Sequence, residues 1–200
     1  MARGTQEGER TLLILPDELR RSRLISDDYR KLQETLHKDP LYGVASTHYA
    51  PVVAKVVNQY GVEELLDYGA GKGRLAQTLG AQRMVTHPLR IQHYDPAVPD
   101  WADAPEPCEM VACIDVLEHI EPELIGNVLD DLQRVTRSIG LFTVATTPAV
   151  KVLEDGRNAH LIVEPSEWWL PQIMGRWDLH TFQKTDDGFL VLVMAREIQH

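Results

Sequence analysis

The sequence has few cysteines and no long apolar run. Its two cysteines, Cys108 and Cys113, do not form a CxxC motif, so we expect buried free thiols rather than a disulfide or a zinc knuckle. No apolar stretch approaches the about 18 residues that a membrane span requires. The charged N-terminus also lacks the apolar segment of a signal peptide. These absences predict a cytoplasmic protein that makes no membrane contact.

Basic side chains are outnumbered by acidic ones, 20 to 30, which gives a net charge of −10. Residues 1–40 contain 8 basic and 8 acidic side chains, so residues 41–200 carry the whole excess, 12 against 22. Such an excess repels a phosphate backbone unless a local basic groove exists, which favours a small-molecule substrate. A chain of 200 residues that is 44% hydrophobic is otherwise typical of one globular domain.

Strand and helix patterns alternate along most of the chain. We expect strands at residues 63–68, 89–94, 110–114 and 141–145, and helices that begin near Thr47, Lys72, Glu121 and Ser166, the last acting as a cap. Such alternation predicts a parallel sheet covered on both faces. Two final strands, 178–184 and 189–197, flank a turn at residues 186–188 and predict an antiparallel hairpin at the sheet edge. The predicted fold class is therefore α/β, a doubly wound, Rossmann-like, mostly parallel sheet with an antiparallel C-terminal hairpin.

The sequence divides into two parts. Residues 1–46 are expected to form an N-terminal helical extension, and residues 47–200 form the main domain. The extension contains a polar, charged pattern over residues 27–38, which ends before Pro40 and predicts a helix outside the main fold. This extension is expected to act as a lid or to mediate a dimer, and the sequence leaves the oligomeric state open.

Three alternating glycines, Gly69, Gly71 and Gly73, follow the first strand of the main domain. Glycines there let the backbone approach a ligand closely and adopt positive φ. The segment matches neither a phosphate-binding P-loop nor the dinucleotide pattern GxGxxG, because Arg74 replaces the last glycine. Asp95 closes the next strand 22 residues after Gly73, about where an acid meets a pair of ribose hydroxyls. The sequence therefore predicts a site for a ligand that contains ribose.

On these residues the chain resembles the class I S-adenosylmethionine-dependent methyltransferases over residues 47–197. The resemblance lies in the segments 67–73, 94–96 and 115–120. It implies that S-adenosylmethionine is the cofactor and that it is bound by Asp67, Gly69, Ala70, Gly71, Gly73, Asp95, Pro96, Asp115 and Val116. Only 19 residues separate Asp95 from Asp115, so we expect the third strand and its helix to be shortened or absent.

Asp115, Glu118 and His119 are spaced i, i+3 and i+4, so a helical turn would place them on one side. Two carboxylates and an imidazole suit Mg²⁺ or Mn²⁺, and His160 is the candidate fourth ligand. This set resembles two metal-using branches of the superfamily, the ubiquinone-biosynthesis O-methyltransferases and the small-RNA 3′-end 2′-O-methyltransferases. Here Asp115 stands where those proteins have a glutamate.

An alternative interpretation needs no metal. Glu118 would then cap or pair within the fold, and His119 or His160 would be the catalytic base that takes the acceptor's proton. In either case we expect O-methylation of a small molecule or sugar. Two further hypotheses stay open, methylation of an RNA terminus and a cofactor-binding partner subunit without catalysis.

Overall fold

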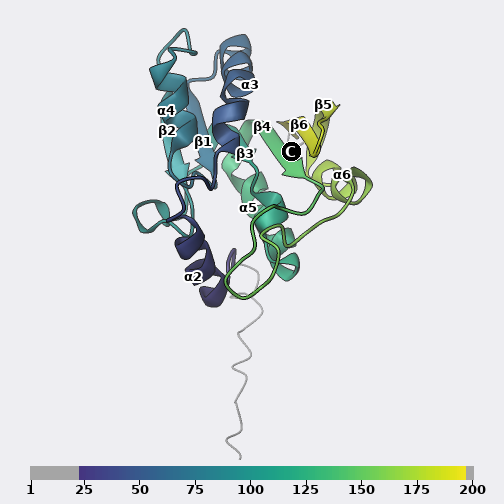
Figure 1. Cartoon of the computed structure of the whole chain (residues 1–200). Helices are drawn as coiled ribbons and strands as arrows, with labels where there is room; N and C mark the ends of the chain where they lie inside the picture. The colour runs from purple at the N-terminus through teal and green to yellow at the C-terminus, as the bar shows by residue number, and fades with distance from the viewer. Residues whose placement is uncertain (1–22, 197–200) are drawn as a thin grey trace, which may run out of the picture.

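A computed structural model describes residues 23–196 of the chain, so the expectations for residues 1–22 and for Glu197 lie outside the described residues. The described chain forms a six-stranded sheet in the order β2-β1-β3-β4-β6-β5. Figure 1 shows this sheet running through the molecule, with α2 below its edge. Its strands are β1 (Glu64–Tyr68), β2 (Arg90–Tyr94), β3 (Cys108–Ile114), β4 (Thr136–Ala145), β5 (Trp177–Lys184) and β6 (Gly188–Ala195).

The first four strands pair in parallel, and β6 pairs antiparallel with both β4 and β5. The predicted fold class and its antiparallel hairpin are therefore confirmed, with β5 as the edge strand. Between β2 and β3 the described chain has no strand and only a short 3-10 turn, Pro99–Trp101. The strand that the short spacing between Asp95 and Asp115 predicts to be shortened or absent is therefore absent. The strand labelled β3 is the one predicted at residues 110–114.

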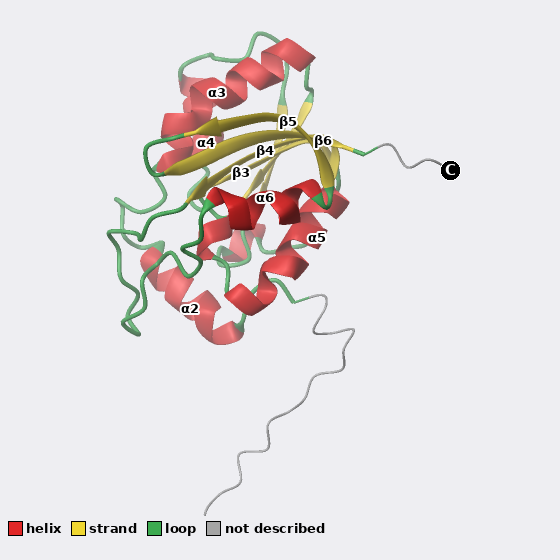
Figure 2. Ribbon diagram, turned by 90° about the vertical axis from the view of Figure 1, so that its right-hand side faces the viewer, coloured by secondary structure: helices red, strands yellow, loops and turns green. Residues whose placement is uncertain are grey.

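Helices cover both faces of the sheet (Figure 2). They are α2 (Asp27–Leu36), α3 (Ala45–Tyr60), α4 (Arg74–Ala81), α5 (Ile125–Val135) and α6 (Ser166–Met174). One apolar cluster joins the sheet to α3 and α4, and another joins it to α5 and α6. Helix α5 buries Ile125, Val128, Leu129, Leu132 and Val135, a helical spacing that places one apolar stripe against the sheet. No helix among the described residues is long and apolar enough to cross a membrane.

The helix expected to begin near Glu121 is present, but its first turn, Pro122–Leu124, is 3-10 and α5 begins at Ile125. Two other expectations for individual elements are wrong. Ser166 is the first residue of α6 rather than its cap, because its hydroxyl bonds Glu167 instead of a backbone amide. Helix α2 does not lie outside the main fold. Its Tyr29 is 3% exposed and donates its hydroxyl hydrogen to the backbone carbonyl of His119 at 2.6 Å.

Candidate cofactor and metal site

A cavity of about 110 Å³ opens at the carboxyl ends of β1, β2 and β3. The end of a parallel sheet, where neighbouring connections diverge, is the usual place for a ligand in this architecture. The floor of the cavity is made of the strand ends and the glycine loop, and its roof includes Tyr29, Gln33, His37 and Tyr42 from the N-terminal segment. All of the predicted cofactor-binding residues except Gly73 line this cavity.

The glycine loop has the positive φ values that its sequence predicts. Gly69, Gly71 and Gly73 have φ values of 79°, 53° and 66°. A Cβ at Gly69 would lie 2.3 Å from a methyl group of Val116, so only glycine fits at this crossing of the two loops.

Most donors of the loop are already used within the protein. The amides of Gly69 and Ala70 both donate to the carbonyl of Tyr94, at 2.8 and 3.0 Å. The amide of Gly71 donates to Asp95 Oδ2 at 2.9 Å. A phosphate-binding loop would instead direct these hydrogens toward the ligand. The loop therefore suits a ligand without a phosphate at this position.

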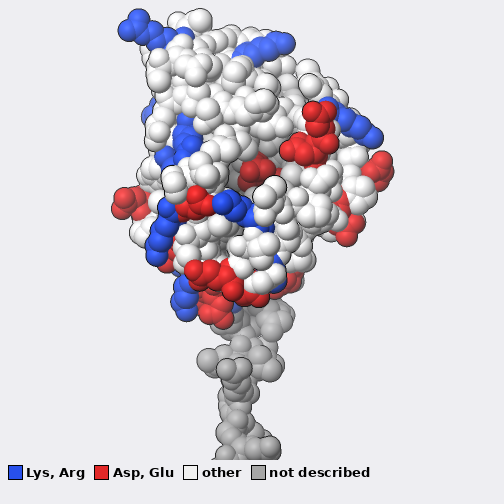
Figure 3. Space-filling view, viewed as in Figure 1, with Lys and Arg blue, Asp and Glu red and all other residues white. Residues whose placement is uncertain are grey.

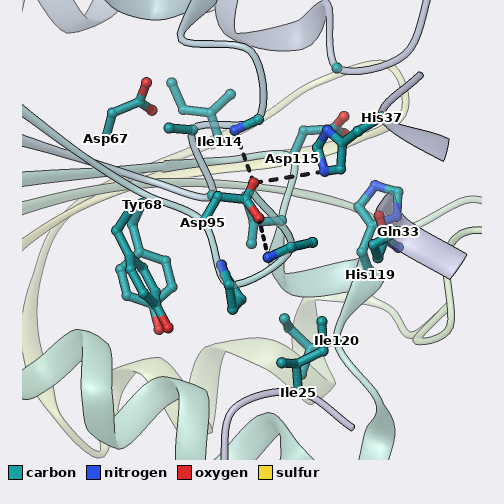
Figure 4. Close-up of a pocket in the computed structure, with 18 of the residues that line it drawn as sticks. Ile25, Gln33, His37, Asp67, Tyr68, Asp95, Ile114, Asp115, His119 and Ile120 are labelled. Carbon is teal, nitrogen blue, oxygen red and sulfur yellow. Dashed lines mark hydrogen bonds and ion pairs between the residues drawn. The ribbon is translucent and has the colours of Figure 1, made fainter. Parts of the chain in front are cut away.

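Asp95 lies at the centre of the site, at the end of β2 (Figure 4). Its Oδ1 accepts from the amide of Ala97 at 2.9 Å, and its Oδ2 lies 3.8 Å from His37 Nε2. The carboxylate is thus oriented by the chain on both sides. An acid fixed in this way retains lone pairs for the hydroxyls of a ligand, as the sequence predicts for a ribose.

Asp67, at the end of β1, is 3% exposed and also lines the cavity. Its Oδ2 lies 3.6 Å from His93 Nδ1, and neither atom has a hydrogen-bond partner within the described residues. Burial raises the pKa of Asp67, although the neighbouring His93 opposes this shift.

Asp115 follows β3 with a φ of 59°, a left-handed conformation that is unusual for a residue with a side chain. Its backbone amide donates to Thr143 Oγ1 on β4 at 3.0 Å. Such strain costs on the order of 1–3 kcal/mol and is commonly found at functional sites. The left-handed turn ends β3 and leads into the short 3-10 turn Leu117–His119.

Three of the four predicted metal-binding residues meet. One donor atom each from Asp115, His119 and His160 lie within 4.8 Å of one another. His119 Nδ1 contacts the carbonyl of Ala159 at 2.8 Å, and His160 Nδ1 contacts the carbonyl of Thr147 at 2.6 Å. A carbonyl oxygen only accepts, so each Nδ1 must carry the hydrogen. In a neutral imidazole held in this way, Nε2 keeps a lone pair.

Glu118 is not part of this group. The segment forms a 3-10 turn rather than the α-helical turn that the spacing suggests, and the Glu118 side chain is fully buried. Its Oε1 accepts from the amide of Ala145 at 2.7 Å. Burial, together with the charge of Asp115, raises the pKa of Glu118 well above its usual range. This bond to β4 is the structural pairing that the metal-free interpretation assigned to Glu118.

The pKa of His119 is lowered to about 4, mainly by burial, with Asp115 opposing and His160 adding to the shift. The imidazole is therefore neutral near neutral pH. A neutral imidazole can act as a metal ligand or accept a proton.

The local sequence patterns do not reveal the residues that cover the site. Gln33 donates to the Tyr29 hydroxyl at 2.5 Å, and the Tyr42 ring packs edge-on against His119 with centroids 5.9 Å apart. Lys72 holds the segment after α2 in place, because its Nζ donates to the carbonyls of Asp39 and Tyr42 at 2.6 and 2.9 Å. These contacts join parts of the chain that are far apart in sequence, so no local pattern predicts them. The only hint in the sequence is the presence of tyrosines in an otherwise polar segment.

Solved structures share this fold, whereas no protein-family model and no curated protein matches the chain. One is 1,6-didemethyltoxoflavin-N1-methyltransferase of Burkholderia thailandensis, with 1,6-didemethyltoxoflavin and S-adenosylhomocysteine bound. It is 15% identical, the match covers 88% of this chain and 92% of that one, and the TM-score is 0.59.

Mitomycin 7-O-methyltransferase is 14% identical, with 84% of this chain and 60% of that one covered and a TM-score of 0.59. Magnesium protoporphyrin IX methyltransferase of Synechocystis, with S-adenosylhomocysteine bound, is 14% identical, with 77% and 84% covered and a TM-score of 0.54. At such low identities these likenesses establish the fold. The chain has the Rossmann-like fold that these methyltransferases share.

Proposed function

We propose that this protein transfers a methyl group from S-adenosylmethionine to a hydroxyl group, with Mn²⁺ or Mg²⁺ bound by Asp115, His119 and His160. One observation carries the proposal. Both imidazoles have Nδ1 at a backbone carbonyl, and one donor atom from each imidazole and from the Asp115 carboxylate lie within 4.8 Å of one another. Metal-binding histidines usually have their second ring nitrogen held in this way.

The residues present fit such a cation. Two imidazoles and one carboxylate are acceptable ligands for Mn²⁺, and the cluster borders the cofactor cavity through Asp115 and His119. A bound cation would lower the pKa of a coordinated acceptor hydroxyl. The protein's own residues would fix the direction of attack, because methyl transfer depends mainly on the alignment of the two reactants.

The remaining residues would bind the cofactor and exclude water. Asp95, held by the amides of Gly71 and Ala97, would accept hydrogen bonds from the ribose hydroxyls. The glycine loop, with its amides already bonded, suits a cofactor that carries no phosphate. Tyr29 and Tyr42 would close the cavity over the reactants.

The proposal is tested by calorimetric titration of S-adenosylhomocysteine into EDTA-treated protein, followed by Mn²⁺. We expect saturable binding of S-adenosylhomocysteine and one Mn²⁺ per chain. His160→Ala should abolish Mn²⁺ binding, whereas His180→Ala, which changes an exposed histidine of β5, should not.

Each outcome has a distinct meaning. Binding of S-adenosylhomocysteine without Mn²⁺ would remove the cation from the proposal and leave His119 or His160 as the base. If S-adenosylhomocysteine does not bind, the methyltransferase proposal is wrong. Binding of both ligands with no methyl transfer to any hydroxyl acceptor would favour a partner subunit without catalysis.

A further inference from the structure

The chain between α2 and α3 lies over the cofactor cavity without being buried itself. We call residues 37–44 the strap. Two of its residues, His37 and Tyr42, belong to the roof of the cavity. No side chain of the strap is buried, and Leu41 is 74% exposed. A segment with so few buried contacts opens at a low cost in free energy.

The cavity is too small for the proposed cofactor while the strap is in this position. Its volume is about 110 Å³. A cavity of about 150 Å³ holds a single benzene ring, whereas S-adenosylmethionine consists of an adenine, a ribose and a methionine chain. Tyr29 and Gln33, the roof residues of α2, are buried and bonded to each other. The strap is therefore the part of the roof that must move to admit the cofactor.

His37 lies where the ribose is expected. Its Nε2 is 3.8 Å from Asp95 Oδ2, a contact that Figure 4 shows as a dashed line. The same ring packs on the glycine loop, since a Cβ at Gly71 would lie 3.2 Å from His37 Cε1. A separation of 3.8 Å is longer than a hydrogen bond. A ligand hydroxyl that bonds Asp95 directly can therefore displace the imidazole.

Two lysines hold the strap closed. Lys72 Nζ bonds the carbonyls of Asp39 and Tyr42, and Lys151 Nζ pairs with Asp39 Oδ2 at 2.5 Å. The Lys151 side chain is 42% exposed, and ion pairs in contact with solvent are weak. Because Lys72 belongs to the glycine loop, the loop that would receive the cofactor also holds the strap.

We propose that the strap is a gate over the cofactor site, in which His37 covers the Asp95 carboxylate until the ribose of S-adenosylmethionine displaces it. This inference rests on the proposed function. Entry of the cofactor requires Lys72 to release the strap, and closure returns the Tyr42 ring to its place against His119. The closed gate excludes water from the metal-binding group while both reactants are bound.

The first test measures the affinity of the full chain for S-adenosylhomocysteine by calorimetry. His37→Ala should raise this affinity about threefold, because Asp95 then has no protein side chain to release before it bonds the ribose. A residue that only lined the site would give the opposite result. His180→Ala, at an exposed position of β5, should leave the affinity unchanged. An unchanged or lower affinity in His37→Ala overturns the proposal.

The second test measures opening of the strap by the rate of chymotrypsin cleavage after Tyr42, located by mass spectrometry. When the strap recloses faster than it is cut, this rate follows the population of the open state. Lys72→Met should raise the rate about fivefold, the effect of losing one solvent-accessible charged contact. Lys55→Met, which makes the same change at an exposed position of α3, should not. S-adenosylhomocysteine should slow cleavage of the wild type.

Equal cleavage rates in the two lysine variants would show that Lys72 does not hold a gate. Cleavage that bound S-adenosylhomocysteine fails to slow would show that the strap does not close over the cofactor. Failure of the proposed function is distinct from both results, because it would appear as absent S-adenosylhomocysteine binding in the wild type. The effect of Lys72→Met on cleavage is measured without any ligand.

Discussion

At the scale of single residues, Gly69 is the position that tolerates least. Alanine there would need a positive φ of 79° and would place its Cβ 2.3 Å from Val116. We expect Gly69→Ala to lower the free energy of unfolding by about 3 kcal/mol, the sum of backbone strain and overpacking. S-adenosylhomocysteine binding should be lost with it. Urea unfolding measures the first effect and calorimetry the second.

Gly80 provides the control for that substitution. It lies within α4, and a Cβ there would meet nothing within 4 Å. Gly80→Ala should stabilise the protein by about 0.5 to 1 kcal/mol, because glycine is a poor helix former. If Gly69→Ala and Gly80→Ala changed the free energy of unfolding by the same amount, the close approach of Gly69 to Val116 would have no energetic consequence.

The buried Asp67 predicts a pH dependence of stability. Burial raises its pKa in the folded protein above that of the unfolded chain, so ionisation opposes folding. This penalty is absent below the unfolded pKa and grows as pH rises toward the folded pKa. Asp67→Asn should therefore raise the melting temperature at pH 8 and have little effect near pH 4. A difference independent of pH would contradict this account.

At the scale of elements, the contact between α2 and the site depends on the Tyr29 hydroxyl. It donates to the carbonyl of His119 and accepts from Gln33, both within the protein interior. Tyr29→Phe leaves the buried His119 carbonyl without this donor, which should cost about 1–3 kcal/mol. We expect faster proteolysis of the segment after α2 and weaker S-adenosylhomocysteine binding.

Tyr60→Phe is the matched control, because Tyr60 is 37% exposed at the end of α3. It should change neither the proteolysis rate nor the binding affinity. If Tyr29→Phe behaves like Tyr60→Phe, the roof over the cavity does not depend on this hydrogen bond.

The same elements show what the sequence could predict. The strands, the glycine loop and the missing third strand follow from local patterns and from the spacing between Asp95 and Asp115. The docking of α2 does not, because Tyr29 and His119 are 90 positions apart and nothing local links them. Glu118 was misplaced because helical spacing assumes an α-helix, whereas the left-handed Asp115 starts a tighter turn.

At the scale of the whole molecule, charge distinguishes between the two candidate methyl acceptors, an uncharged small molecule and an RNA terminus. The net charge is −10, and the face shown in Figure 3 has acidic and basic side chains interspersed instead of a continuous basic tract. Binding of a nucleic acid requires several lysines or arginines that neutralise successive phosphates. The surface visible in this view therefore favours an uncharged acceptor over an RNA terminus.

The net negative charge predicts the outcome of a filter-binding experiment with a single-stranded RNA of about 20 nucleotides and a salt series. We expect no retention even at about 50 mM salt, where the attraction of phosphates to basic side chains is strong. Retention by the wild type that falls steeply with salt would instead reveal a phosphate-binding surface. Such salt-dependent retention would favour an RNA terminus as the acceptor, because it arises when basic side chains displace counterions from the strand.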